Sequence, residues 1–283
     1  MMAERPLQGK VAIITGAGSP IGLGHAMAVG LVRAGARVAL LDLNASWLEQ
    51  SAADMRSIGG AECALPIVTD ITQPEAVDQA VRRTIAECGG VHILVNNAGI
   101  NQRAAGFTTG PTSNFWEISP EAWSRVVAVN LSGAFFMARA IVGHLLTQGW
   151  GRIIGVTTSL DTMWRKGGTP YGPSKAGHEA LVAAMAQELD GTGVTANVLV
   201  PGGATYTNMT ASNPAYDKEQ LIQPEVMQAP VVWLASEASN GFNGRRIIGY
   251  FWDERLPLEA RLEKASAPAA WPQLGRQAIF PGR

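Results

Sequence analysis

The sequence contains little cysteine and little charge, and neither sign of charge is in excess. Its 283 residues include only two cysteines, Cys63 and Cys88, which fit no metal-ligand spacing and no disulfide framework. Charged residues make up 16% of the chain, and 22 Lys and Arg nearly balance 23 Asp and Glu. No basic stripe is present to neutralise the phosphates of nucleic acid or of an anionic membrane. We therefore expect no metal, no nucleic-acid partner and no membrane partner.

The sequence also predicts no signal peptide and no membrane-spanning segment. The first residues, MMAERPLQGK, lack the apolar core of a signal peptide. No apolar run approaches the length that a bilayer span requires. With 47% hydrophobic residues the chain can bury a substantial core, so we expect a cytoplasmic globular protein.

Short β-branched and apolar runs alternate with helical patterns along most of the chain. The runs that read as strands are 11–15, 36–43, 61–68, 91–99, 152–158, 194–200 and 244–250. Apolar strands separated by helices predict an α/β fold, a doubly wound parallel sheet of about seven strands with helices on both faces. Ligands of such sheets bind at the carboxyl ends of the strands. The pattern predicts one domain over 1–253 and an extension, 254–283, that packs on the body or on a partner subunit.

A glycine-rich turn, TGAGSPIGLG over 15–24, follows the first strand. Glycines at this place let the backbone approach a pyrophosphate, and the N-terminus of the next helix offers N–H groups and partial positive charge. Ser19 and Pro20 fit a helix cap and a first helical residue, which predicts a helix over 21–34. Pro20 also removes one N–H donor from the turn.

Asp42 ends the second strand, about twenty residues after the turn. A carboxylate there accepts hydrogen bonds from the adenosine ribose and repels a 2′-phosphate. No Arg or Lys lies in the turn or just after Asp42, so NAD is favoured over NADP. The alternative is that Asp42 only caps the following helix.

Tyr171 and Lys175 lie four positions apart at the start of a predicted helix. An ordinary phenol, with a pKa of about 10, gains little from a neighbouring cation unless its proton takes part in a reaction. An ammonium one turn away stabilises the phenolate, which suits a group that exchanges a proton with an alcohol or a ketone. The alternative reading places both residues on an unremarkable helix surface.

Six motifs follow one another in a familiar order: TGAGSPIG, Asp70 in TDIT, NNAG at Asn96–Gly99, Asn130 in VNLSG, the pair Tyr171 and Lys175, and Pro201–Gly203. Over about residues 7–250 the chain resembles the short-chain dehydrogenase/reductase family. The resemblance implies a Rossmann-type core, a nicotinamide cofactor and hydride transfer between an alcohol and a carbonyl. It also implies a homo-oligomer, a dimer or a homotetramer.

The resemblance assigns catalytic roles to four residues. Tyr171 is the general acid and base, Lys175 lowers its pKa and holds the nicotinamide ribose, and Asn130 anchors a water that reaches Lys175. The family's serine lies thirteen residues before the tyrosine, where this chain has Thr158. Ser159, the next residue, is the alternate for that role.

The cofactor residues that the motifs and the resemblance imply run along the whole carboxyl edge. They are Gly16, Ser19, Pro20, Ile21, Gly22, Asp42, Leu43, Asp70, Ile71, Asn97, Ala98, Gly99, Tyr171, Lys175, Pro201, Gly202, Ala204 and Thr207.

Substrate specificity is expected in the long segment 100–123 and near the catalytic residues. Candidate pocket residues are Phe107, Trp116, Met163, Trp164 and Tyr206, which favour an apolar or aromatic-bearing small-molecule alcohol or ketone. The aromatics could instead fasten the segment to the body or to a partner subunit. Arg165 and Lys166 leave open a polyol or sugar-acid dehydrogenase. A catalytically silent NAD-binding sensor is the alternative from another class.

Overall fold

A computed structural model describes residues 5–106, 114–211 and 217–274 of the chain. The described residues form an eight-stranded sheet in the order β3-β2-β1-β4-β5-β6-β7-β8. The strands are β1 Val11–Thr15, β2 Arg37–Asp42, β3 Ala64–Val68, β4 Ile93–Asn96, β5 Gly151–Val156, β6 Val194–Val200, β7 Arg245–Ile248 and β8 Ser266–Pro268. The strands β1 to β7 are all parallel, which confirms the predicted doubly wound sheet.

The eighth strand corrects the predicted count of about seven. β8 pairs antiparallel with β7, with Ala267 opposite Arg246 and Pro268 opposite Arg245. The sequence Ser-Ala-Pro has no β-branched residue and gave no strand signal. It becomes a strand because the edge of β7 presents backbone groups that need partners. At the other end of the sheet, the outermost strand β3 contains Pro66, opposite Leu40.

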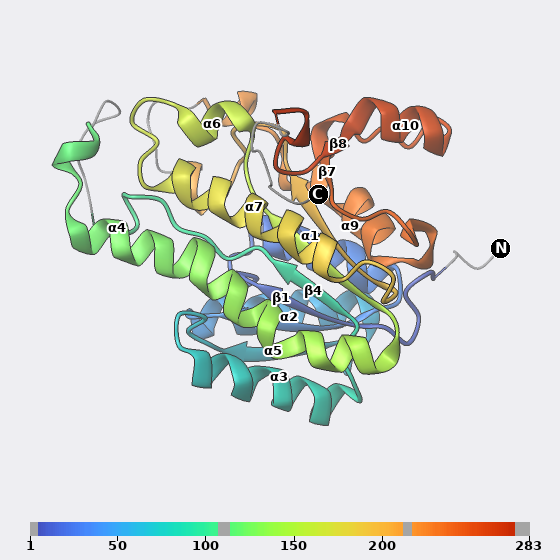
Figure 1. The fold of residues 1–283 in the computed structure, drawn as a ribbon. Coiled ribbons are helices and arrows are strands. Elements are labelled where there is room, and N and C mark those ends of the chain that lie inside the picture. Colours follow the sequence, from blue (N-terminus) through green and yellow to red (C-terminus); the bar gives the residue numbers. More distant parts are fainter. Residues whose placement is uncertain (1–4, 107–113, 212–216, 275–283) are drawn as a thin grey trace, which may run out of the picture.

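Helices cover both faces of the sheet (Figure 1). On one face lie α1 Leu23–Arg33, α2 Ala45–Gly59 and α9 Gln228–Ala235; on the other lie α3 Pro74–Cys88, α5 Gly133–Gln148 and α7 Tyr171–Glu188. Shorter helices are α4 Pro120–Val127, α6 Leu160–Trp164, α8 Asn208–Ala211 and α10 Leu258–Ala265. Single 3₁₀ turns occupy Phe115–Glu117, Lys218–Gln220, Pro224–Met227, Glu237–Ser239, Gly249–Phe251 and Pro272–Leu274.

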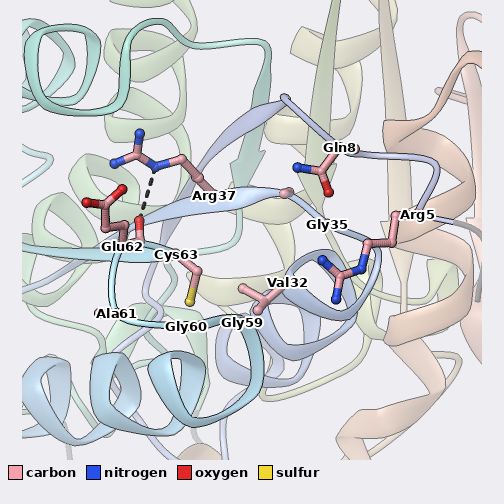
Figure 2. Close-up of a pocket in the computed structure, with 11 residues that line it drawn as sticks. Arg5, Gln8, Val32, Gly35, Arg37, Gly59, Gly60, Ala61, Glu62 and Cys63 are labelled. Atoms are coloured by element: carbon pink, nitrogen blue, oxygen red, sulfur yellow. Dashed lines mark hydrogen bonds between the residues drawn. The ribbon is translucent and has the colours of Figure 1, made fainter. Parts of the chain in front are cut away.

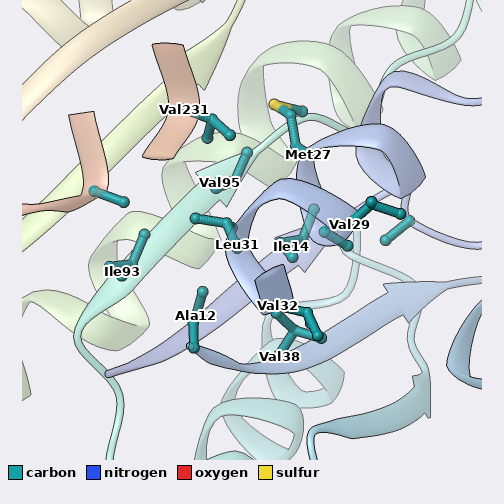
Figure 3. Packing of buried hydrophobic residues seen from close by; sticks show 14 of the residues in the cluster. Ala12, Ile14, Met27, Val29, Leu31, Val32, Val38, Ile93, Val95 and Val231 are labelled. Carbon is teal, nitrogen blue, oxygen red and sulfur yellow. The ribbon is translucent and has the colours of Figure 1, made fainter. Parts of the chain in front are cut away.

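The core consists of two apolar layers, one on each side of the sheet. In the first layer α1 and α9 lie side by side on the sheet, and Met27 and Leu31 of α1 pack in one cluster with Ile14, Val95 and Val231 (Figure 3). All five side chains are completely buried. The layer fixes α1 against β1, and this contact places the glycine turn that joins them.

One helix overturns the expectation that no apolar stretch is long enough to cross a membrane. Pro120–Gln148, which runs through α4 and α5, has 29 residues and a most apolar window of mean hydropathy 1.7. Here α5 packs against α3, β4 and β5, and the polar Asn130 lies completely buried in the middle of the helix. The apolar residues of this long helix thus include the residues of α5 that pack against the sheet.

The start of α1 also differs from the prediction of a helix over 21–34. The helix begins at Leu23, its N-cap is Gly22, and no side chain caps it. The Gly22 N–H donates to the Ser19 carbonyl at 2.9 Å, which closes a turn before the helix. Because this turn occupies 19–22, Pro20 lies in the turn and the Ser19 hydroxyl does not reach the helix N-terminus.

Gly24 in the first turn of α1 should not tolerate a side chain. A Cβ there would contact the Gly16 carbonyl and lie 2.7 Å from Asn97 Nδ2. We expect Gly24→Ala to lower the free energy of unfolding by about 1–3 kcal/mol, because the packed backbone must move. Denaturant unfolding measures this change.

Gly143→Ala is the matched control, because no atom lies within 4 Å of a Cβ at that exposed helical position. The control should raise stability by about 0.5–1 kcal/mol. Equal losses in both variants would contradict the packing argument.

Candidate active site

The order of the strands reverses between β1 and β4, which lie side by side at the centre of the sheet. A network of hydrogen bonds joins the two strand ends there. The Thr15 hydroxyl accepts from the backbone N–H groups of Asn97 and Ala98, both at 3.0 Å. The Asn97 amide donates in return to the carbonyls of Thr15 at 2.9 Å and Gly16 at 3.0 Å. Ligands of doubly wound sheets bind at this point, so these residues lie where a cofactor is expected.

The glycine turn fits a dinucleotide. Gly16 has a φ of +63°, and a Cβ there would lie 2.8 Å from Ala98 Cα. The Ser19 hydroxyl is buried without a partner in the described chain. Among the described residues, we also find no intramolecular acceptor for the N–H groups of Ser19 and Ile21. Unpaired donors next to a helix N-terminus are the groups that bind phosphate oxygens, so Pro20 leaves usable donors on both sides of itself.

Asp42 lies against the same turn. Its carboxylate accepts from the Gly18 N–H at 3.0 Å and from the Asn44 N–H at 3.1 Å. The cap of α2 is Asn44, whose side chain accepts from the Trp47 N–H at 3.1 Å. The helix cap is therefore a different residue, which weakens the alternative reading of Asp42. Leu43, beside it, is 65% exposed.

Tyr171 and Lys175 lie in the first turn of α7, facing the end of β5. The Lys175 ammonium is buried and donates to the Val156 carbonyl at 2.8 Å. The Tyr171 phenol lies near the Thr158 side chain, which lowers the pKa of the phenol. The Ser159 hydroxyl pairs instead with that of Thr162, at 2.8 Å. The structure thus brings Thr158, and not Ser159, to the phenol.

The electrostatics of the pair differ from the expectation. Burial raises the pKa of Tyr171 to about 12, and the neighbouring Thr158 side chain lowers it only in part. Burial also lowers the pKa of Lys175 to about 8. Lowering of the Tyr171 pKa by Lys175 is therefore not found. Loss of water around the phenol outweighs the lysine, whose ammonium is directed at a backbone carbonyl.

Asn130 lies in a π-helical stretch, Ala128–Ser132, between α4 and α5. Its oxygen accepts from the Ile100 N–H at 2.8 Å, and its amide donates to the Ile100 carbonyl and to the Ser174 hydroxyl, both at 2.9 Å. The side chain therefore binds the segment after β4 to α7. A Cβ on Gly99 would lie 3.1 Å from Lys175 Nζ and 3.4 Å from Asn130 Oδ1, so the three residues meet.

Two more groups of predicted cofactor residues lie along the same edge. Asp70 accepts from Thr72 through its N–H at 2.9 Å and its hydroxyl at 2.7 Å. Ile71 is buried and contacts Gly133 at the start of α5. After β6, the Pro201 carbonyl accepts from the Tyr250 N–H at 3.0 Å.

The segment after β6 bends at Gly202 and then lies beside Ile222. Gly202 has a φ of +111°, and a Cβ there would lie 2.7 Å from that of Tyr250. The Ala204 carbonyl accepts from the Ile222 N–H at 3.0 Å, and the Tyr206 N–H donates to the Ile222 carbonyl at 2.8 Å. Thr207 follows in the same stretch, before α8.

The predicted substrate residues are not gathered into one lining. Met163 is buried beneath the start of α7, whereas Trp164 is 68% and Trp116 69% exposed. Trp116 packs edge-on against Phe115, with ring centroids 5.2 Å apart. Phe107 lies outside the described residues. Arg165 and Lys166 are exposed.

A cavity of about 300 Å³ lies away from this site. Figure 2 shows it where β2 and β3 begin, the edge opposite to the glycine turn, with Arg5, Gln8, Arg37 and Cys63 around it. The Arg37 guanidinium there donates to three backbone carbonyls, those of residues 62, 87 and 88. The cavity is therefore separate from the candidate active site.

Three buried polar residues near the site were missed from the sequence: His178, Glu179 and Arg246. All three are less than 9% exposed, and neither ring nitrogen of His178 has a partner among the described residues. His178 and Glu179 follow Lys175 by three and four positions, so helical spacing could have placed them on its face. Nothing in the sequence around Arg246 distinguishes it from a solvated charge.

Comparison with known proteins decides the family. Residues 10–218 match the family model described as short chain dehydrogenase. The chain belongs to the short chain dehydrogenase family. The resemblance of its motifs is therefore confirmed, and the protein is an oxidoreductase of a family that uses nicotinamide cofactors.

Individual relatives are similar over most of their length. The chain is 30% identical to a hydroxy(phenyl)methylsuccinyl-CoA dehydrogenase subunit of Thauera aromatica, with 84% of this chain and 94% of that protein covered. It is 32% identical to D-threitol dehydrogenase of Mycolicibacterium smegmatis, with 86% and 92% covered. A solved short-chain type dehydrogenase/reductase from Mycobacterium marinum superposes with a TM-score of 0.76 at 29% identity, with 87% and 97% covered.

Burial of His178 predicts a specific loss of stability in acid. Burial, together with the charge of Lys175, lowers the pKa of His178 to about 3, so the folded protein keeps the ring neutral. The unfolded chain binds a proton below its ordinary pKa of about 6.5, so stability falls as pH drops from there toward 3. Between pH 7 and 5 the wild type should lose about 2 kcal/mol more than His178→Leu.

Urea unfolding of both proteins at several pH values measures this difference. Comparing each protein with itself at pH 7 removes the packing change that the substitution causes. Parallel pH profiles for the two proteins would contradict the assignment.

Proposed function

We propose that the protein is an NAD-dependent oxidoreductase that interconverts a secondary alcohol and a ketone. One observation carries the proposal: the Tyr171 phenol lies close enough to Thr158 for that side chain to lower its pKa, at the carboxyl edge of the sheet, with the buried Lys175 one turn further along α7. The unpaired donors of the glycine turn lie at the same edge. A proton-exchanging group and a dinucleotide site on one edge are what hydride transfer requires.

Each residue has a part in the reaction. When bound, the nicotinamide accepts the hydride of an alcohol or supplies one to a ketone. Tyr171 removes or returns the hydroxyl proton, and Thr158 holds the substrate oxygen and stabilises its developing charge. Lys175, which lies one turn along α7 and whose ammonium donates to the Val156 carbonyl, would hold the nicotinamide ribose. Asn130 holds the 99–100 segment in contact with Lys175.

NAD is the proposed cofactor because of Asp42. Its carboxylate lies against Gly18 in the glycine turn, where an adenosine ribose would approach. A 2′-phosphate placed there would meet a negative charge, and the sequence supplies no neighbouring cation to compensate.

The proposed substrate is an apolar or aromatic-bearing secondary alcohol. The exposed Phe115, Trp116 and Trp164 support this class, as does a relative whose name includes a phenyl group. A polyol or sugar acid is the second candidate, favoured by the exposed Arg165 and Lys166 and by the threitol dehydrogenase relative.

A silent NAD sensor is disfavoured, since a protein without catalysis does not need Tyr171, Thr158 and Lys175 brought together. We also propose a cytoplasmic homo-oligomer whose catalytic domain spans 1–253. In this proposal the extension 254–283 packs on that body. The pairing of β8 with β7 supports this arrangement.

Tyr171→Phe tests the catalytic assignment. The substitution keeps the ring and removes the proton, so kcat should fall by roughly 10²–10⁴-fold while NAD binding stays nearly unchanged. Absorbance of the reduced cofactor across a panel of ketones and alcohols measures turnover, and calorimetry measures NAD binding. Tyr250→Phe, at a 60% exposed tyrosine, is the control and should keep full activity. Retained turnover in Tyr171→Phe would refute the role.

Asp42→Asn tests the choice of cofactor. Without the negative charge, repulsion of a 2′-phosphate disappears, and the preference for NAD over NADP should fall by roughly tenfold, the equivalent of about 1.4 kcal/mol. The ratio of kcat/KM for the two cofactors measures the preference. An unchanged ratio would show that Asp42 does not select the cofactor.

A further inference from the structure

A buried ion pair lies behind the end of β5, between α7 and β7. Arg246 Nη1 is 3.3 Å from Glu179 Oε1, and the two side chains are 8% and 0% exposed. Moving a charged group out of water costs much free energy, and pairing and hydrogen bonds are needed to offset that cost. The groups that are hydrogen-bonded to the pair show which segment it holds in place.

Both charged groups bind the segment that carries the proposed catalytic hydroxyl. Arg246 Nη2 donates to the Thr158 carbonyl at 3.0 Å. The Thr157 hydroxyl donates to Glu179 Oε2 at 2.9 Å. Two consecutive residues after β5 are thus held by opposite ends of one ion pair.

The geometry of the sheet explains why an arginine is needed. β6 lies between β5 and β7, so the side chain of Arg246 must pass over a whole strand to reach Thr158. The planar guanidinium can then bond a carboxylate with one arm and a carbonyl with another. A lysine ammonium, which is a single point charge, does not reproduce this fork.

The C-terminal extension completes the network. β8 runs beside Arg246, with Ala267 as its partner, and the Ala270 N–H then donates to Glu179 Oε1 at 3.4 Å. The extension therefore covers the ion pair and supplies a hydrogen bond to its carboxylate.

We propose that Arg246 and Glu179 are positioning residues that fix the backbone at Thr158, and with it the hydroxyl that lies near Tyr171. The inference rests on the proposed function, in which that hydroxyl holds the substrate oxygen. A shift of about 1 Å in a group that contacts the substrate can lower turnover by roughly 100-fold. Loss of the pair should therefore lower kcat and leave the glycine turn and Asp42, which carry the proposed pyrophosphate and adenosine part of the NAD site, unchanged.

Two variants test the proposal without leaving a buried charge alone. The double variant Arg246→Met with Glu179→Gln is neutral at both positions. The amide oxygen of the glutamine can accept from the Ala270 N–H, and its NH2 group can donate to the Thr157 hydroxyl oxygen. Arg246→Lys keeps the charge opposite Glu179 but loses the fork. Both should show kcat lowered by roughly 10- to 100-fold. The KM for the alcohol and the Kd for NAD should stay within about twofold of wild type.

Arg245→Met is the matched control. Arg245 neighbours Arg246 on β7 and donates to the Ser266 hydroxyl of β8 at 3.2 Å, so its loss disturbs the same pair of strands without touching Thr158. The control should keep the wild-type kcat. A wild-type kcat in both Arg246 variants, or an equal loss of kcat in the control, would overturn the proposal.

A crystal structure of the double variant makes the test independent of turnover. Displacement of the Thr158 backbone is the expected result, and an unmoved Thr158 overturns the positioning role. Failure of the proposed function looks different: the wild type would then show no turnover, while Thr158 would still move when the ion pair is removed.

Discussion

The site depends on the hydrogen bonds that join the ends of β1 and β4. The Thr15 hydroxyl accepts from two backbone N–H groups of the segment after β4, and the Asn97 amide returns two hydrogen bonds to the turn after β1. These bonds hold the glycine turn directly beside the Asn96–Gly99 segment, at the point where the strand order reverses. Gly16 is required there because any side chain would separate the two segments.

From this junction the catalytic residues are placed by a chain of contacts. Asn130 binds Ile100 and Ser174, and so joins the segment after β4 to α7. Lys175 on α7 binds the last residue of β5, and the residues that follow β5 carry the hydroxyl that meets Tyr171. The bonds made by Asn130 and Lys175 are buried or part-buried and go to backbone or to a short side chain, which favours a rigid site over an adaptable one.

Much of this was predictable from the sequence. Strands of β-branched residues such as Val11–Thr15 and Val194–Val200 were located to the residue, because their apolar runs are bounded by clear turn signals. The predicted start of α1 was wrong. Ser19 and Pro20 satisfy the local rules for a helix cap, but a turn between Ser19 and Gly22 delays the start of the helix to Leu23.

Other features could not be predicted, since they depend on distant partners. β8 has no strand signal of its own and exists through β7. Arg246 and Glu179 are far apart along the chain, and each alone resembles an ordinary surface charge. The raised pKa of Tyr171 is likewise a consequence of burial, which spacing along a helix does not reveal.

The two ends of the sheet share a feature with a consequence for assembly. The outermost strands, β3 and β8, each contain a proline, Pro66 and Pro268, and proline has no N–H to offer a further strand. Neither edge therefore presents an unbroken ladder of donors and acceptors. Extension of the sheet from one molecule into the next is therefore disfavoured at both edges.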